Sequence, residues 1–541
     1  MGWDKGYNRD MRGILNWLLL VSLLFLNWQT FITGAATASD PAVCSIPAGI
    51  SVRFHPDDEL RVGDLVSIEV FSTRRGIDYS QQRLSVSLNN QQIGSAGFGN
   101  SGNGSFISVL QWAWDTKGLP TGNYQLAFSV LPAGITWTQT VTLHDAIPNA
   151  NSYQWKTAQT ACCVINYISN TAAGRDLSQI LPVIQARAEK AAAALHTSLL
   201  PQKIVINLLP RLLGHGGFTT DEIYVSYPDH PYTDADFSQV LEHEMIHRLD
   251  ASLGGKYRPI FFVEGLAVYA TGGHYKTEPL VGRAAALYRL GWYIPLSYLA
   301  NNFYPSQHEI GYLEASTVIA YMVDTWGWDA FSSFYRDIQG SNRGDATAID
   351  NALQRHFSIT FKQLEDRYVN LLQSQPVNPD LVNDVRDTIE LYDTLRAYQQ
   401  ALDPSAYYRQ LWTPSGKDAR ARQIVGDYLR QPDSPINQEI EADLANASQD
   451  LRAGKYNQVQ AILFTIQQRL LGLPKQNCSQ PGKVALMQNN NASDLAMAQS
   501  HGKVAVDTFQ PSPVWISYFM NSDAGLRAAL ENRAGYWQAA P

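Results

Sequence analysis

Cysteine is scarce in this chain, which limits both its redox chemistry and its choice of metal ligands. The four cysteines are Cys44, Cys162, Cys163 and Cys478, and none has the paired spacing of a zinc ribbon or a redox CxxC motif. A cysteine-based metal site is therefore excluded. We expect no disulfide between the adjacent Cys162 and Cys163, because the peptide between them would be strained. An oxidising compartment would allow one or two disulfides, whose partners the spacing leaves open.

Clusters of basic residues are also missing. Charged residues make up 17% of the sequence, the formal net charge is -8, and lysine and arginine are spread along the chain without a rich run. Because nucleic-acid-binding domains present a concentrated basic surface, no nucleic-acid partner is expected. Hydrophobic residues make up 45% of the 541 residues, which is enough for globular cores, and this length predicts about three domains.

Beyond the N-terminus the chain has no apolar run long enough to span a bilayer. Near the start, three basic residues precede an apolar stretch at residues 14–26, and Ala-Thr-Ala at residues 36–38 fits a cleavage site. We therefore predict that residues 1–38 are a signal peptide, or a membrane anchor if they are not cleaved. Either alternative predicts an extracytoplasmic protein that is secreted or associated with the cell envelope.

The residues from 45 to 146 predict a β-sandwich. Short runs with alternating apolar residues, such as those at 65–70 and 84–88, are separated by turn-forming residues. The segment at residues 114–124 resembles a loop motif of bacterial immunoglobulin-like modules. This region carries no cluster of titratable residues, so we expect a spacer or a binding module. Trp112 and Trp114 would share one face of a strand, where core packing is favoured over a sugar-binding platform.

The sequence pattern changes after residue 152, from strands alone to a mixture of strands and helices. Residues 153–374 alternate short apolar strands, at 164–168, 203–209 and 223–227, with helical segments, which predicts an open sheet backed by helices. Residues 376–475 are mainly helical, and Gly454 marks the turn of a helical hairpin. Residues 476–541 form a small mixed C-terminal segment for which we have no functional interpretation.

An HExxH motif, formed by His243, Glu244 and His247, is the strongest functional signal in the chain. It falls in a predicted helix from about residue 234 to 253, with a capping-box-like start at Thr233 and Asp236 and an end at Gly254. Residues four apart share one helix face, so both imidazoles can reach one metal ion while the glutamate faces the water that reacts.

A third ligand is predicted at Glu264. Sixteen residues separate it from His247, enough for the first helix to end and a second helix to return antiparallel. Phe261, Phe262, Glu264, Gly265 and Ala267 resemble the aromatic-x-x-Glu-Gly-x-Ala pattern of the gluzincin group, in its peptidase MA-like families. Two histidines and one carboxylate leave a fourth position open, as catalytic zinc sites do.

This resemblance implies a central α+β thermolysin/gluzincin-like metallopeptidase domain that binds Zn²⁺ and hydrolyses a peptide or protein substrate. Glu244 would be the general base, and the substrate would lie along a sheet edge formed by residues 223–227. No Gly-x-Met-Glu-Asn segment is present, so the aminopeptidase branch is not supported. The alternatives are a zinc amide or ester hydrolase and a non-catalytic envelope scaffold, which the intact Glu244 disfavours.

Other residues near the motif also have candidate roles. Tyr312, on a predicted helix that runs to Trp326, corresponds to the tyrosine that in these families donates a hydrogen bond to the oxyanion, and His308 is its rival. Asp250 is either a partner that orients a histidine or a surface carboxylate. The remaining histidines with no assigned role are expected in loops, and they are His215, His230 and His274.

Overall fold

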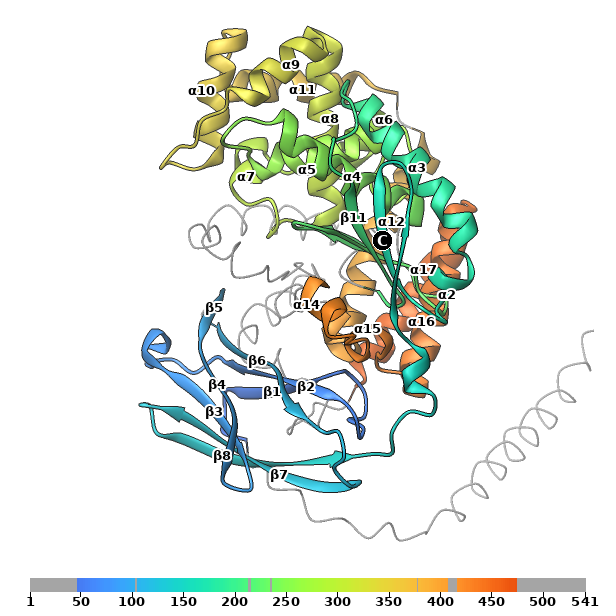
Figure 1. Ribbon diagram of the computed structural model, residues 1–541. Coiled ribbons are helices and arrows are strands. Elements are labelled where there is room, and N and C mark those ends of the chain that lie inside the picture. The colour runs from blue at the N-terminus through green and yellow to red at the C-terminus, as the bar shows by residue number, and fades with distance from the viewer. Residues whose placement is uncertain are drawn as a thin grey trace, which may run out of the picture. The chain divides into compact units, whose positions relative to one another are not determined.

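The computed structural model describes residues 46–102, 105–212, 216–233, 236–376, 378–406 and 416–473 (Figure 1). The predicted export segment at residues 1–38 and the C-terminal segment at residues 476–541 lie outside these ranges. So do Cys44, Cys478 and His215. Within the described ranges, no helix is both long and apolar enough to cross a membrane.

A β-rich N-terminal region precedes the helical part of the chain (Figure 1). Its strands are β1 Ile50–His55, β2 Leu65–Ser72, β3 Arg83–Leu88, β4 Gln91–Gly97, β5 Gly99–Gly102, β6 Ser105–Asp115, β7 Gly122–Leu131 and β8 Ile135–Leu143. Across the described residues they form two four-stranded antiparallel sheets, in the orders β1-β2-β6-β5 and β4-β3-β7-β8. Inward-facing residues of both sheets, such as Val66, Leu84 and Phe128, share one hydrophobic cluster.

Trp112 and Trp114 are both buried, so the favoured packing role is confirmed. The expectation that they share one face is wrong. Trp112 has a positive φ of 47°, and the pairing of β6 with β2 is irregular at this point, so the alternation of side chains is interrupted. Trp114 packs in the cluster between the two sheets, whereas the Trp112 indole donates a hydrogen bond to Asp427 at 2.9 Å. Neither ring forms an exposed platform.

The central part of the chain contains a five-stranded mixed sheet, counted over the described residues, in the order β12-β13-β11-β10-β9. Its strands are β9 Trp155–Gln159, β10 Cys163–Ile168, β11 Ile204–Leu209, β12 Gly217–Thr219 and β13 Ile223–Ser226. The outer strands β9 and β12 are antiparallel to their neighbours, and the three inner strands are parallel.

The prediction that residues 223–227 form an edge of the sheet is wrong. β13 pairs with β11 on one side and with β12 on the other, so it is an inner strand. The edge on this side of the sheet is β12, a three-residue strand that begins at Gly217. Such a short segment with a glycine has little strand propensity of its own, and it is ordered here by pairing with β13.

The expected absence of a disulfide between Cys162 and Cys163 is also wrong, because the structure records one. Cys162 lies in the bend that follows β9, and Cys163 is the first residue of β10. Cys162 is not part of a strand, so its side chain is not held on the face opposite to that of Cys163, as neighbours in a regular strand are. Both cysteines are buried in the central hydrophobic cluster.

Helices make up most of the remaining chain. Those before residue 375 are α2 Ala172–Arg175, α3 Leu177–Ala194, α4 Phe237–Leu253, α5 Ile260–Thr271, α6 Leu280–Arg289, α7 Leu296–Asn301, α8 His308–Trp326, α9 Trp328–Arg336, α10 Asp345–Phe357 and α11 Phe361–Ser374. Those after it are α12 Pro379–Leu402, α14 Gly416–Ala421, α15 Gly426–Leu429, α16 Pro435–Arg452 and α17 Tyr456–Leu471.

The predicted helical hairpin around Gly454 is confirmed, since α16 and α17 pack against each other and Gly454 has a φ of 71°. One hydrophobic cluster extends from β10 through α4, α5 and α8 to α12, α16 and α17. The helices that carry the HExxH motif and Glu264 are therefore held from several sides by a common core.

Candidate metal centre

Helix α4 presents the two motif histidines on one side and a core face on the other. It begins at Phe237, and the Asp236 side chain caps it by accepting hydrogen bonds from the backbone N–H groups of Ser238 and Gln239. The predicted role of Thr233 in this cap is wrong, because α4 begins at Phe237 and Asp236 is its N-cap residue. Leu241, Met245 and Leu249 recur every four residues and are fully buried. This packing fixes the rotation of the helix and directs His243 and His247 to its opposite side.

Helix α5 brings Glu264 to the histidines. It is apolar on nearly all sides, and Glu264 is only 6% exposed. Gly265 allows close contact with α8, because a Cβ atom at this position would lie 2.9 Å from the Cβ of Ala315. A buried carboxylate needs a charged or hydrogen-bonding partner, and the two histidines provide it.

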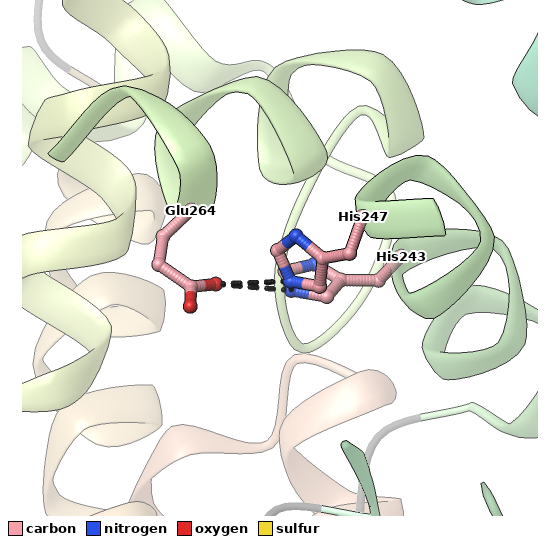
Figure 2. A group of neighbouring side chains, drawn as sticks. All are labelled: His243, His247 and Glu264. Atoms are coloured by element: carbon pink, nitrogen blue, oxygen red, sulfur yellow. Dashed lines mark hydrogen bonds and ion pairs between the residues drawn. The ribbon is translucent and has the colours of Figure 1, made fainter. Parts of the chain in front are cut away.

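The three side chains converge on one point (Figure 2). Oε2 of Glu264 lies 3.3 Å from Nε2 of His243 and 3.3 Å from Nε2 of His247, and the two Nε2 atoms are 3.1 Å apart. The two imidazoles extend side by side from α4, and the carboxylate approaches them from α5 (Figure 2). The structure therefore brings together all three residues that the sequence predicts as metal ligands.

The pKa values of the group follow from burial and from the charge of Glu264. Burial lowers the pKa of His243 to about 4. Burial also acts to lower the pKa of His247, but the negative charge of Glu264 outweighs it and raises that pKa to about 9. The same ion pair holds the pKa of Glu264 well below its usual value, against the effect of burial. One proton, carried by His247, therefore balances the charge of the Glu264 carboxylate. A divalent ion bound at this point would displace that proton.

Tyr304 completes the environment of Glu264, and sequence reasoning did not identify it. Its phenol donates a hydrogen bond of 2.6 Å to Oε1 of Glu264, the oxygen that does not face the histidines. Tyr304 lies in the segment between α7 and α8, 40 residues beyond Glu264. No local pattern marks it, so only the tertiary structure reveals the contact.

Glu244 lies beside the group and is held by the edge strand. Thr219, the last residue of β12, donates a hydrogen bond of 2.6 Å to Oε2 of Glu244. Burial raises the pKa of Glu244 to about 7, although the charge of His247 and the bond from Thr219 act to lower it. A carboxylate with a pKa near neutrality can accept and release a proton at physiological pH.

The approach of β12 to α4 requires glycine at position 217. A Cβ atom there would lie 2.7 Å from Cγ1 of Val240, 3.0 Å from the carbonyl oxygen of Tyr224 and 3.2 Å from Cγ of Glu244. The outer edge of the sheet thus reaches the helix turn that carries Glu244. An extended chain that paired with β12 would pass close to this carboxylate.

Tyr312 and His308 both lie near the group, on the first two turns of α8. The ring of Tyr312 is 6.1 Å from the ring of His243 between centroids and 4.2 Å from that of His308. Burial, followed by the negative charge of Glu264, raises the pKa of Tyr312 well above its usual value. Its phenol therefore stays protonated, as a hydrogen-bond donor must.

Asp250 is fully buried, so the alternative of a surface carboxylate is excluded. Its Oδ2 atom accepts hydrogen bonds from Arg258 at 2.8 Å and from Tyr335 at 3.0 Å. Asp250 lies one helix turn beyond His247, and its negative charge contributes to the raised pKa of that histidine. It supports the charge of the group without being one of the three converging residues.

The remaining histidines differ in their surroundings. His230 contacts Glu441 and Gln431, away from the motif. His274 lies in the loop after α5, as expected, but it is not a peripheral residue. Its ring centroid is 5.7 Å from that of His243 and 4.4 Å from that of Tyr312. Glu309, which sequence reasoning also missed, accepts a hydrogen bond from His274 at 2.6 Å.

No family model and no curated protein matches the sequence. Among solved structures, the chain is similar to an aminopeptidase N family protein from Idiomarina loihiensis, with a TM-score of 0.28 and 9% identity over 62% of this chain and 78% of that chain. It is also similar to yeast LTA4 hydrolase in complex with bestatin, with a TM-score of 0.28 and 12% identity over 93% of this chain and 96% of that chain. Both likenesses are weak, so the assignment of the site depends on its own residues.

Proposed function

We propose that this chain is a zinc-dependent peptidase in which His243, His247 and Glu264 hold the metal and Glu244 is the general base. The observation that carries the proposal is the convergence of three buried ligand atoms beside a fourth residue, Glu244, that is positioned by Thr219. Two histidines and a carboxylate around one open position are typical of a catalytic rather than a structural zinc site.

The spacing of the three atoms fits a zinc ion. Tetrahedral zinc with bonds of about 2.0–2.1 Å places its ligand atoms about 3.3 Å from one another. The separations among the two Nε2 atoms and Oε2 of Glu264 are 3.1, 3.3 and 3.3 Å. A zinc ion fits among these atoms with only small side-chain movements.

The residues around the metal position can carry out hydrolysis of an amide bond. A bound zinc ion supplies Lewis-acid chemistry to the scissile carbonyl and to the attacking water. Glu244 takes the proton from that water and delivers it to the leaving amine, for which its pKa of about 7 is suited. Tyr312 donates a hydrogen bond to the oxyanion, a task that a neutral phenol can perform without adding charge.

The substrate that we propose is a peptide or protein in extended conformation, paired with β12. This strand is the free edge of the described sheet next to Glu244, and its backbone groups can bind a peptide without regard to its sequence. A thermolysin/gluzincin-like fold for the central part and an immunoglobulin-like sandwich for the N-terminal sheets belong to the same proposal. So does export, with residues 1–38 as a signal peptide or anchor.

Hydrolysis of a broad library of quenched peptides, with a matched set of esters and simple amides, tests this function. The zinc-loaded protein should cleave peptides, and Glu244→Gln should keep its zinc but lose the activity. Cleavage of esters or simple amides alone would favour the broader zinc hydrolase. Bound zinc without any Glu244-dependent turnover would favour a non-catalytic envelope scaffold and overturn the proposal.

A further inference from the structure

A second group of two histidines and one carboxylate lies next to the first. His274 follows α5, while His308 and Glu309 begin α8. Nδ1 of His274 lies 2.6 Å from Oε1 of Glu309, and Nδ1 of His308 lies 3.2 Å from the same oxygen. One ligand atom from each residue falls within 4.8 Å of the others.

This group repeats the pattern of the proposed zinc site. In both, two imidazole nitrogens converge on a single carboxylate oxygen in a buried position. His308 is 9% exposed and Glu309 is 6% exposed, while the side chain of His274 is 13% exposed. Imidazole nitrogen with carboxylate oxygen is a donor set that suits zinc and other divalent transition metals.

A small cavity beside His274 and Glu309 offers further ligands. It has room for about one water molecule. Its polar lining residues also include Glu278 and Arg283. Oε1 of Glu278 forms an ion pair of 2.8 Å with Nε of Arg283, whereas Oε2 of Glu278 is buried without a hydrogen-bond partner among the described residues. A buried carboxylate oxygen is costly unless water or a cation satisfies it, and the cavity is where such a group would lie.

We propose that His274, His308 and Glu309 form a second metal site, which binds a divalent transition metal such as zinc and opens toward the cavity at Glu278. The two sites share no ligand. Both oxygens of Glu264 already have partners, which are Tyr304 and the first pair of histidines, so this carboxylate does not bridge the two sites as a shared ligand does in two-metal centres. The Tyr312 ring lies near both, with its centroid 6.1 Å from that of His243 and 4.4 Å from that of His274.

Metal stoichiometry tests this proposal on the full chain. After saturation with zinc and removal of the excess, elemental analysis should find two zinc ions per chain in the wild-type protein. Glu309→Gln and His308→Ala should each retain one, and so should His243→Ala, which removes a ligand of the first site instead. His356→Ala is the matched control, because His356 is an exposed histidine that contacts Asp337. It should retain two.

The result that overturns the proposal is one zinc ion per chain, lost in His243→Ala and kept in Glu309→Gln. In that case the second group is a hydrogen-bonded ion pair, and the proposed peptidase site is unaffected. Should a variant fail to fold, an anomalous difference map at the zinc edge of wild-type crystals decides the matter. Two peaks, one at each group, support the proposal, and a single peak at the first group overturns it.

Discussion

Tyr304 donates a hydrogen bond of 2.6 Å to one oxygen of Glu264, while the other oxygen lies 3.3 Å from each motif histidine. The phenol thereby holds the carboxylate with one oxygen toward the metal position. Partners of this kind, which contact a ligand rather than the metal, orient the ligand and tune its basicity. Tyr304 is thus a positioning residue, distinct from Tyr312, to which we assign a contact with the substrate.

Replacement of Tyr304 by phenylalanine should weaken zinc binding. The bond to Glu264 is lost while the ring remains, and removal of such a partner costs about 10- to 100-fold in metal affinity. Competition with a zinc chelator measures this change. Tyr321→Phe, on a distant turn of α8, is the control and should bind zinc like the wild type. Unchanged affinity in Tyr304→Phe would show that the bond does not position the ligand.

Tyr312→Phe should affect the catalytic rate rather than zinc binding. The zinc content should stay the same, and kcat should fall by about 100- to 1,000-fold, as for the loss of one oxyanion donor. The KM should change little, because the hydrogen bond forms mainly in the transition state. Steady-state kinetics at saturating zinc measure both parameters. A fall in zinc content without a fall in kcat at saturating zinc would contradict the assigned role.

Thr219→Val should reduce hydrolysis through Glu244. The substitution removes the donor that holds Oε2 of Glu244 but keeps the branched shape of the side chain. We expect kcat to fall about 10- to 100-fold, which is typical of residues that support a catalytic group, with zinc still bound. Thr220→Val is the matched control, because the hydroxyl of Thr220 donates to the carbonyl of Glu222 and, among the described residues, has no hydrogen bond to Glu244. Equal activity in the two variants would exclude this role for Thr219.

Gly265→Ala should destabilise the central part of the chain. The added Cβ would lie 2.9 Å from both the Cβ and the carbonyl carbon of Ala315, so α5 and α8 must separate. Overpacking of this kind costs about 1–3 kcal/mol of the free energy of unfolding. Thermal unfolding measures the loss as a lower Tm. Gly174→Ala, where the nearest atom lies at 3.5 Å, should be tolerated and serves as the control.

The stability of the N-terminal sheets should depend on His55. This fully buried residue lies 2.9 Å from Glu69 and 3.3 Å from Asp57. Burial acts to lower its pKa, but the two carboxylates outweigh burial and raise the pKa above the usual value of 6.5. The charged form therefore stabilises the fold below about pH 6.5, and this contribution is lost as the pH rises through the raised pKa of the folded state.

Urea unfolding of wild type and His55→Gln at pH 6 and pH 9 measures this dependence. The difference in unfolding midpoint between the two proteins should be larger at pH 6. A difference that is the same at both pH values, or larger at pH 9, would exclude a charged His55 in the folded protein.

The sequence was sufficient to predict the parts of the site that depend on local spacing. His243 and His247 meet because residues four apart share a helix face, and Glu264 was recognised because it is a carboxylate in an apolar helix with a familiar pattern around it. The three inner strands of the central sheet and the helical hairpin at Gly454 were predicted from periodicity, with small errors at their ends, whereas the outer strands β9 and β12 were not predicted.

The parts that escaped prediction depend on tertiary contacts. Thr219 reaches Glu244 only because a three-residue strand is ordered by its neighbour, and Tyr304 reaches Glu264 from a loop. His274 was expected to be a loop residue, and its position alone does not indicate that α8 brings Glu309 against it. In each case the partner lies on another element, at a separation that periodicity cannot specify.

The central claim is that hydrolysis depends on a zinc ion held by His243, His247 and Glu264. Titration of zinc into chelator-treated protein, with peptide cleavage and bound zinc recorded in the same samples, tests it most directly. Cleavage should be absent without zinc and should rise with occupancy in the wild type, whereas Glu264→Gln should need a higher zinc concentration. Full cleavage by the metal-free protein, or restoration that is identical in Glu264→Gln, would contradict the claim.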